Sequence, residues 1–333
     1  MSSYLLVPQD EFPHPPGADL HFNESVYMNA FDHRQRWGGW MRLGNRVNEG
    51  YAELAVCLYL PDGRIACQFQ RPGITGNTQF SAGGLEVTVH EPLQHLSMHY
   101  RGELLIVDDP QLLRDPKALF GGAPRVAAEM HWEQRGISPV HGGLPATATQ
   151  DTLYGRDFSL GHFNQHTQVR GELRLGTETF ALGGCGWRDH SWGPRVWQNI
   201  VFDRLYMANF GEKAGLMLLK IANRDGRVRR GGVLMVDGDY EEILDLDIFN
   251  EWSEAMDPVS FQLGIRTAKR SARITGRILN CAPLRNRRID QGVTLHSRIA
   301  ECFTELYWDG QVGYGMTEYV EVMRDGIPVG YPL

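Results

Sequence analysis

The sequence predicts an all-β protein made of two consecutive antiparallel β units, each folded as a barrel or a sandwich. Three observations support this prediction: short β-prone segments alternate with turn signals, helical periodicity is scarce, and a stretch rich in Pro and Gly divides the chain near its middle. The 333 residues are 42% hydrophobic and 22% charged, so the chain can bury a large core without disulfides or a structural metal.

The clearest hairpin joins residues 51–60 to residues 64–71 through the turn sequence PDG at 61–63. Asp-Gly between two apolar runs is a strong signal for a tight turn that connects antiparallel strands. The same dipeptide occurs within 216–236 and within 306–322, so we predict two further hairpins there.

Residues 87–107 are also β-prone, and we place a turn near Arg101 and Gly102. Helix is expected to be limited to one or two short turns in 109–120 and to 245–256, whose apolar residues show some helical spacing. Neither segment is long enough to define an α/β fold.

A domain boundary is predicted within 137–151, which is rich in Pro, Gly, Ala and Thr and has few large apolar residues. It would separate an N-terminal β unit over 1–150 from a C-terminal β unit over 151–333. The alternative is a long loop inside a single domain.

The formal net charge of −7 argues against a nucleic-acid partner, which would require a basic face. The five scattered cysteines form no C-x-x-C pair, so we expect neither structural zinc nor a disulfide framework. No apolar run approaches the ~20 residues that span a bilayer, and the first residues do not resemble a signal peptide. We therefore expect a cytoplasmic protein without stable membrane insertion, metal or cofactor. A homodimer through edge strands is compatible with such a fold, although no feature predicts it.

The segment GGCGWRDHSWGPRVW, residues 183–197, places several charged and aromatic side chains between glycines. In an extended strand, successive side chains alternate between two faces. The two sets are Trp187, Asp189 and Ser191 on one face, and Arg188, His190 and Trp192 on the other. Asp189 and His190 are therefore not expected to form a dyad. One interpretation is structural, in which an arginine pairs with a carboxylate and the tryptophans fill the core.

The core GWRDHSWG resembles the G-(aromatic)-x-D-H-x-W/F-G signature of the lipocalin-like hydroxyneurosporene synthase superfamily, which includes carotenoid 1,2-hydratases and kievitone hydratase. Weaker similarity to a bacterial branch of this superfamily extends over most of the chain, through 22–32, 38–54, 162–173 and 307–319. The resemblance implies two consecutive lipocalin-like β-barrels or sandwiches.

The resemblance also implies acid catalysis on an apolar, often prenylated, substrate, in which the motif aspartate protonates a double bond and water captures the cation. That role falls to Asp189, with His190 and Arg188 orienting or tuning it, and with Trp187 and Trp192 lining the cavity. Trp187 replaces the usual tyrosine and Arg188 stands where histidine is common. If Arg188 contacts Asp189, it favours the ionised carboxylate and weakens the proton donor.

A carboxylic acid can protonate an alkene near neutral pH when apolar surroundings raise its pKa. A neighbouring indole can stabilise the developing cation by about 0.5–2 kcal/mol. Four further side chains are candidates for substrate binding: Glu24, Tyr27, Arg46 and Arg195.

His162 and His166 have the i, i+4 spacing of two zinc ligands on a helix. Their flanks are strand-like and H-E-x-x-H is absent, so the metalloprotease pattern fails, although both would share one face of a strand. The usual motifs of serine hydrolases, P-loop NTPases and dinucleotide-binding enzymes are also absent.

The resemblance implies a lyase-like enzyme, a hydratase, dehydratase or double-bond isomerase, that uses acid catalysis on a terpenoid or other apolar small molecule in a β-barrel cavity. One alternative is a non-catalytic carrier of a hydrophobic ligand, in which the RDHSWG stretch is a structural clasp. Another is a cyclase or pericyclase that holds a reactive conformer.

Overall fold

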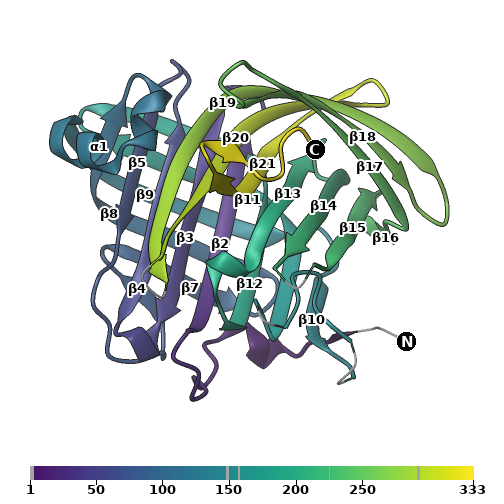
Figure 1. Cartoon of the computed structure of the whole chain (residues 1–333), viewed down its shortest axis with the longest axis horizontal. Coiled ribbons are helices and arrows are strands. Elements are labelled where there is room, and N and C mark those ends of the chain that lie inside the picture. Colours follow the sequence, from purple (N-terminus) through teal and green to yellow (C-terminus); the bar gives the residue numbers. More distant parts are fainter. Residues whose placement is uncertain (1–3, 148–149, 157, 225, 291–292) are drawn as a thin grey trace. The chain divides into compact units, whose positions relative to one another are not determined.

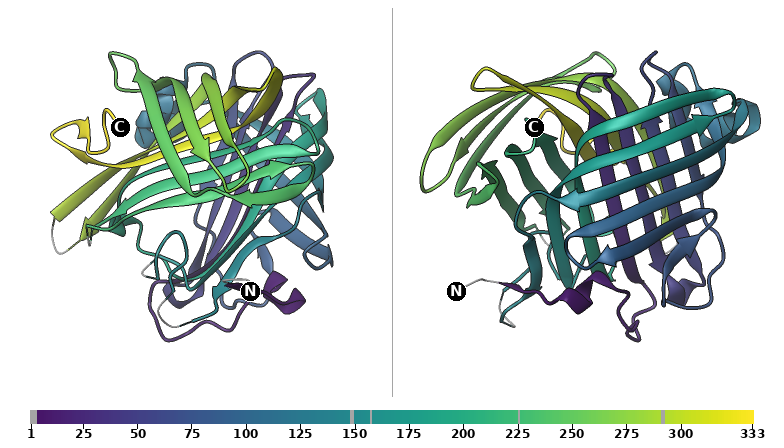
Figure 2. Two further views of the ribbon diagram at one scale, coloured as in Figure 1. Left: turned by 90° about the vertical axis from the view of Figure 1, so that its right-hand side faces the viewer. Right: turned by 180° about the vertical axis from the view of Figure 1, so that it is seen from behind.

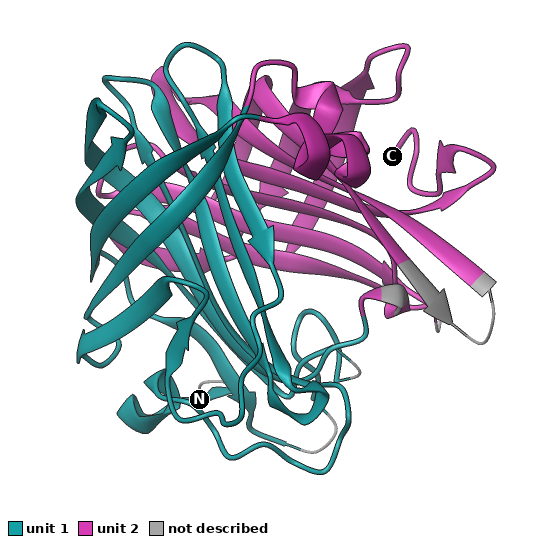
Figure 3. Ribbon diagram, turned by 90° about the vertical axis from the view of Figure 1, so that its left-hand side faces the viewer, with its two compact units in different colours: residues 1–106, 124–196 teal, residues 107–123, 197–333 magenta. Residues whose placement is uncertain are grey.

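The computed structural model describes residues 4–147, 150–156, 158–224, 226–290 and 293–333 (Figure 1). The chain forms two compact units, coloured separately in Figure 3. Unit 1 comprises Met1–Ile106 and Pro124–Val196, and unit 2 comprises Val107–Ala123 and Trp197–Leu333. Both units consist of antiparallel strands with a few short helices, which confirms the predicted fold class.

The elements of unit 1 follow one another along the chain as a series of strands with two short 3₁₀ helices. They are β1 (Tyr4–Leu5), η1 (Pro8–Glu11), β2 (Phe22–Asp32), β3 (Trp37–Arg46), η2 (Val47–Glu49), β4 (Tyr51–Tyr59), β5 (Ile65–Gln70), β6 (Phe80–Ala82), β7 (Leu85–Glu91), β8 (His95–Val107), β9 (Arg125–Gly136), β10 (His141–Pro145), β11 (Gly161–Leu175) and β12 (Glu178–Pro194).

The elements of unit 2 begin with the short helical segment between β8 and β9 and continue after β12. They are η3 (Pro110–Arg114), α1 (Pro116–Gly122), η4 (Trp197–Asn199), β13 (Ile200–Asn209), β14 (Ala214–Asn223), β15 (Val228–Val236), β16 (Asp239–Glu242), β17 (Asp245–Trp252), β18 (Pro258–Arg266), β19 (Ser271–Asp290), β20 (Val293–Trp308), β21 (Gln311–Arg324) and β22 (Ile327–Pro328).

In unit 1 the path β11–β12–β2–β3–β4–β5–β8 closes on itself, because β9 pairs with both β8 and β11. In the right-hand view of Figure 2, the purple strands β2 and β3 cross the blue and teal strands at a steep angle, as on opposite walls of a barrel. Closure leaves the ring without free strand edges. This arrangement is the lipocalin-like barrel that the resemblance implied.

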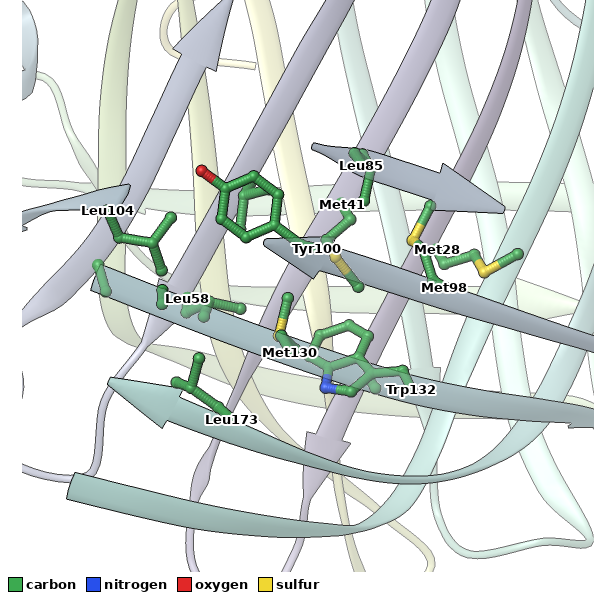
Figure 4. Close-up of a cluster of buried hydrophobic side chains, with 14 of the residues drawn as sticks. Met28, Met41, Leu58, Leu85, Met98, Tyr100, Leu104, Met130, Trp132 and Leu173 are labelled. Carbon is green, nitrogen blue, oxygen red and sulfur yellow. The ribbon is translucent and has the colours of Figure 1, made fainter. Parts of the chain in front are cut away.

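Apolar side chains fill the interior of this barrel. Figure 4 shows Met28 of β2, Met98 of β8, and Met130 and Trp132 of β9 gathered in this interior. A barrel ring of this size encloses a space that side chains can occupy completely. Leu182 of β12 belongs to the same buried cluster, so the even-numbered residues of β12 face the interior.

Unit 2 is built on one sheet in the order β16–β15–β14–β13–β21–β20–β19–β18–β17. Arg230 of β15 forms an ion pair with Asp245 of β17 at 2.9 Å and donates to the carbonyl of Leu246 at 3.3 Å. These contacts bring the two ends of the sheet together around a core that contains Tyr206 and Phe261, whose ring centroids lie 4.7 Å apart.

The Asp-Gly hairpins agree with the prediction. Strands β4 and β5 pair across the PDG turn, and β20 and β21 pair across Asp309 and Gly310. Both turn residues have positive φ, 50° and 78°, the left-handed conformation that the two central positions of a type I′ turn require. Strands β14 and β15 also pair as predicted, although Asp225 in their turn lies outside the described residues.

The turn predicted near Arg101 and Gly102 is wrong. Both residues lie inside β8, where they pair with Glu129 and Ala128 of β9. The chain reverses earlier, between β7 and β8, where Leu93 has a φ of 63°. Strand pairing with β9 therefore outweighs the local turn preference of a glycine.

Helix forms in one of the two segments expected to contain it. Residues 109–120 contain η3 and the start of α1, as predicted. The segment 245–256 instead begins with strand β17, because its backbone pairs with β18 and tertiary pairing overrides a short helical spacing. No helix in the described part of the chain is long and apolar enough to cross a bilayer.

The two compact units divide at a different point from the predicted boundary between 1–150 and 151–333. The division follows Val196, because β11 and β12 complete the ring of unit 1 by pairing with β9 and β2. The stretch 137–151 contributes β10 to unit 1. The GWRDHSWGPR motif, placed by the prediction in a C-terminal domain, consequently belongs to unit 1.

Candidate active site

The motif strand β12 presents side chains on two faces. Its pairing with β11 and β2 continues through the motif, so that Asp189 lies opposite Asn164 and Tyr27. The alternation predicted from the sequence is therefore present. The side chains on the inward face, toward the barrel interior, are Arg188, His190 and Trp192, and those on the outward face are Trp187, Asp189 and Ser191.

Arg188 is bound on the inward face. Its Nη1 donates to Glu11 Oε1 at 2.7 Å, while Nε and Nη2 donate to Gln165 Oε1 at 2.9 and 2.8 Å. The ring of Phe163 lies 5.4 Å from the guanidinium carbon. Because Arg188 points away from Asp189, the contact that would weaken Asp189 as a proton donor is not formed.

Glu24 of β2 is the centre of a second inward-facing polar group. Its Oε1 accepts hydrogen bonds from His14 Nδ1 at 2.6 Å and from His190 Nε2 at 3.0 Å. Its Oε2 accepts from the backbone N–H of His14 at 2.7 Å and from Asn77 Nδ2 at 2.6 Å. Burial alone raises the pKa of Glu24, but the hydrogen bonds and charges of the two histidines together outweigh it and hold this pKa below its usual value.

The histidines of this group are packed against aromatic rings. Trp192 stacks on His14 with ring centroids 4.0 Å apart and an interplanar angle of 15°. The ring of His190 contacts Phe80 and Phe163, with centroids 5.2 and 5.3 Å away. His190 and Trp192 are therefore anchored in the wall of the barrel interior.

On the outward face, Asp189 lies beside His162 of β11. His162 Nε2 is 3.7 Å from Asp189 Oδ1, beyond hydrogen-bond length, and the two side chains are 9% and 19% exposed. The ring of Tyr154 lies 4.6 Å from that of His162. Burial and the positive charge of His162 lower the pKa of His141 to about 4, so His141 stays neutral near neutral pH. This face thus places a carboxyl group beside an imidazole, the two kinds of side chain that most often serve as general acids and bases.

Two of the predicted aromatic residues share the outward face with Asp189. Tyr27 lies directly opposite it on β2, and Trp187 lies two residues before it on β12. The ring of Trp187 packs edge-on against His166 at 4.6 Å. His166 and His162 share a face of β11 as expected, but four strand residues span ~13 Å, too far for both to bind one ion.

Hydrogen bonds of Arg195 and Arg46 hold the segment that follows β12 in place. Arg195 Nη2 donates to Ser191 Oγ at 2.8 Å, its Nε donates to the carbonyl of Phe158 at 3.2 Å, and its guanidinium carbon lies 4.0 Å from the Phe158 ring centroid. Arg46 donates to the carbonyl of Arg195 at 3.3 Å through both Nη atoms and to Glu49 at 2.5 Å through Nε. Through these contacts Arg195 connects the end of β12 to the segment before β11, and Arg46 connects the end of β3 to Arg195.

The predicted site residues consequently fall into three groups. They are Asp189, Trp187 and Tyr27 on the outward face, Arg188, His190, Trp192 and Glu24 on the inward face, and a pair linked by hydrogen bonds, Arg46 at the end of β3 and Arg195 just after β12. Sequence reasoning missed Glu11, His14 and Gln165 as inward partners. It singled out His162 for its spacing from another histidine, whereas the pairing of β11 with β12 is what brings His162 beside Asp189.

Unit 2 contains a separate set of buried charged groups that no motif marked. Arg204 and Arg298 both donate to the carboxylate of Glu321. Burial and a neighbouring carboxylate raise the pKa values of Asp203 and Glu301 well above their usual range. Burial in this unit therefore favours the protonated form of both carboxyl groups.

The chain belongs to the family described as Domain of unknown function (DUF7064), whose model matches residues 7–323. No curated protein matches the sequence. The fold is similar to that of protein NE1406 of Nitrosomonas europaea, an AttH candidate, with 13% identity and a TM-score of 0.59 over 96% of this chain and 98% of that one.

Two further crystal structures share this fold. CghA, solved with Sch210972, is 12% identical with a TM-score of 0.58 over 99% of this chain and 96% of that one. Kievitone hydratase from Nectria haematococca is 9% identical with a TM-score of 0.57 over 96% of this chain and 94% of that one. At these identities the similarity establishes the fold, and it confirms the architecture that the motif resemblance implied.

Proposed function

We propose that this protein is an acid–base enzyme that adds water to, removes water from, or moves a carbon–carbon double bond in a terpenoid or other apolar small molecule. Asp189 and His162 form the proton-transfer pair. The observation that supports this most is their 3.7 Å separation on the outward face of β12, with Arg188 bound elsewhere by Glu11 and Gln165.

The reaction begins when the protonated member of the pair donates its proton to one alkene carbon. The π electrons form the new C–H bond, and a carbocation remains at the other carbon. In hydration, water attacks that carbon and returns one proton to the pair, so the enzyme is unchanged. In isomerisation, an adjacent carbon loses its proton to the pair and the double bond shifts.

Trp187 and Tyr27 suit the intermediate, because they flank Asp189 on the same face. An aromatic face attracts a cation, by about 2 kcal/mol or more in a desolvated site. Two proteins with the same fold support a small-molecule substrate, because one is named a hydratase and the other was solved with Sch210972.

The test is to incubate the protein with a panel of prenylated and terpenoid alkenes in ¹⁸O-labelled water and, separately, in D₂O. Mass spectrometry would detect a gain of one labelled water by hydration, or deuterium incorporation by isomerisation. Asp189→Asn and His162→Gln should each reduce turnover by about 10²–10⁴-fold, the usual contribution of a general acid or base.

The matched controls are Asp247→Asn and His131→Gln, which change exposed residues on other strands. They should retain full turnover. Turnover that survives in both Asp189→Asn and His162→Gln would refute the assignment of this pair.

A non-catalytic carrier is the second candidate. It is favoured by the inward half of the motif, where Arg188 and His190 make buried hydrogen bonds typical of a structural clasp. Equal binding of apolar ligands by the wild type and Asp189→Asn, with no turnover by either, would support the carrier. Conversion of a polyene to a cyclic product without label uptake would instead support a cyclase.

A further inference from the structure

We propose that His14, Glu24 and His190 form a binding site for one divalent transition-metal ion of the zinc class. The site lies on the inward face of β12 and does not depend on the proton-transfer role of Asp189. Its three residues come from the segment after η1, from β2 and from β12. An ion there would join three separate parts of the chain.

The three ligand atoms are close enough to surround one ion. One oxygen of Glu24 and one nitrogen each of His14 and His190 all lie within 4.8 Å of one another. Glu24 Oε1 is 2.6 Å from His14 Nδ1 and 3.0 Å from His190 Nε2. Zinc bonds of ~2.0–2.2 Å in a tetrahedron separate ligand atoms by about 3.4 Å. Binding therefore requires the Glu24–His14 pair to widen by about 0.8 Å and the Glu24–His190 pair by about 0.4 Å, with release of the hydrogen-bonded protons.

Neighbouring groups orient two of the three ligands, His14 and Glu24. A metal-bound histidine usually donates its other ring N–H to a carboxylate, and His14 Nε2 lies 3.3 Å from Asp10 Oδ1. Asn77 Nδ2 and the backbone N–H of His14 hold Oε2 of Glu24, which leaves Oε1 directed at the two imidazoles.

The ligand set selects the class of metal. Two imidazole nitrogens with one carboxylate suit zinc, cobalt or iron, whereas magnesium and calcium prefer oxygen ligands. The rings of Trp192, Phe80 and Phe163 pack around the histidines and limit access of bulk water. Three protein ligands leave one tetrahedral position for a water molecule.

The test is to treat the full-length protein with a chelator and titrate it with Co²⁺, followed by Zn²⁺ as a competitor. We expect visible cobalt absorption that saturates at one equivalent and disappears when zinc is added. A cobalt spectrum dominated by thiolate charge transfer would overturn the proposal, because it would assign the ion to cysteines.

His14→Gln should weaken Co²⁺ binding by about 100-fold or more, because it removes a ligand from a half-buried position outside the strands. Asp10→Asn should weaken it by about 10–100-fold, the usual effect of losing an orienting carboxylate. His131→Gln, which changes an exposed residue of β9, is the matched control and should bind Co²⁺ as the wild type does.

The metal affinity of the wild type keeps the proposal testable even if a variant unfolds. Absence of saturable one-to-one binding in the wild type would overturn it. So would wild-type affinity in a folded His14→Gln variant. Neither result would bear on Asp189 and His162, whose test measures turnover.

Discussion

The two faces of β12 differ in how their polar groups are satisfied. On the inward face, Arg188 and His190 are buried and form short hydrogen bonds to carboxylates from η1 and β2. On the outward face, Asp189 keeps a partly exposed carboxyl group 3.7 Å from His162. One strand can therefore supply a structural clasp and a candidate reactive group from alternate positions. Residues that are adjacent in the sequence can therefore have different roles.

The largest effect should come from breaking the inward ion pair. Arg188→Met leaves the carboxylate of Glu11 buried without its cation, which typically costs about 3–5 kcal/mol. We expect the free energy of unfolding, measured with urea, to fall by that amount. The double variant Glu11→Gln, Arg188→Met should recover part of the loss. A loss below about 1 kcal/mol in the single variant would show that the pair does not hold the barrel together.

A smaller effect should appear as a pH dependence near the outward face. Burial and the charge of His162 lower the pKa of His141 from 6.5 to about 4. The unfolded chain therefore takes up a proton at a higher pH than the folded protein does. Stability should be full above pH 6.5 and fall by up to about 3 kcal/mol as the pH drops to 4. In His141→Gln this part of the pH dependence of the urea midpoint should disappear. An unchanged profile would contradict the assignment.

The smallest effect on stability should come from the outward carboxyl group itself. Asp189→Asn removes a partly exposed pair with His162, so the free energy of unfolding should change by less than about 1 kcal/mol. Together with a large loss of turnover, this would separate the two faces experimentally. A destabilisation as large as that of Arg188→Met would mean that Asp189 is also structural.

Local signals in the sequence predicted strands and turns correctly where those signals agreed with the strand pairing of the folded protein. The Asp-Gly turn at Asp309 and Gly310 forms as expected, because two positive-φ positions suit the twist of a hairpin. Gly102 and the apolar spacing in 245–256 led to wrong predictions. Gly102 lies in β8, which pairs with β9, and 245–256 begins with β17, which pairs with β18. Cross-strand pairing decided these segments.

The sequence by itself determined the all-β class, the main hairpins and the division of the motif into two faces, because all three depend on local turn chemistry and on the two-residue period of a strand. The tertiary structure decided the partners of each face. Glu11, His14 and Glu24 reach the inward side chains from more than 160 residues away, and His162 reaches Asp189 through the register of β11 on β12. Such long-range pairings follow from closure of the barrel, and a local pattern does not encode them.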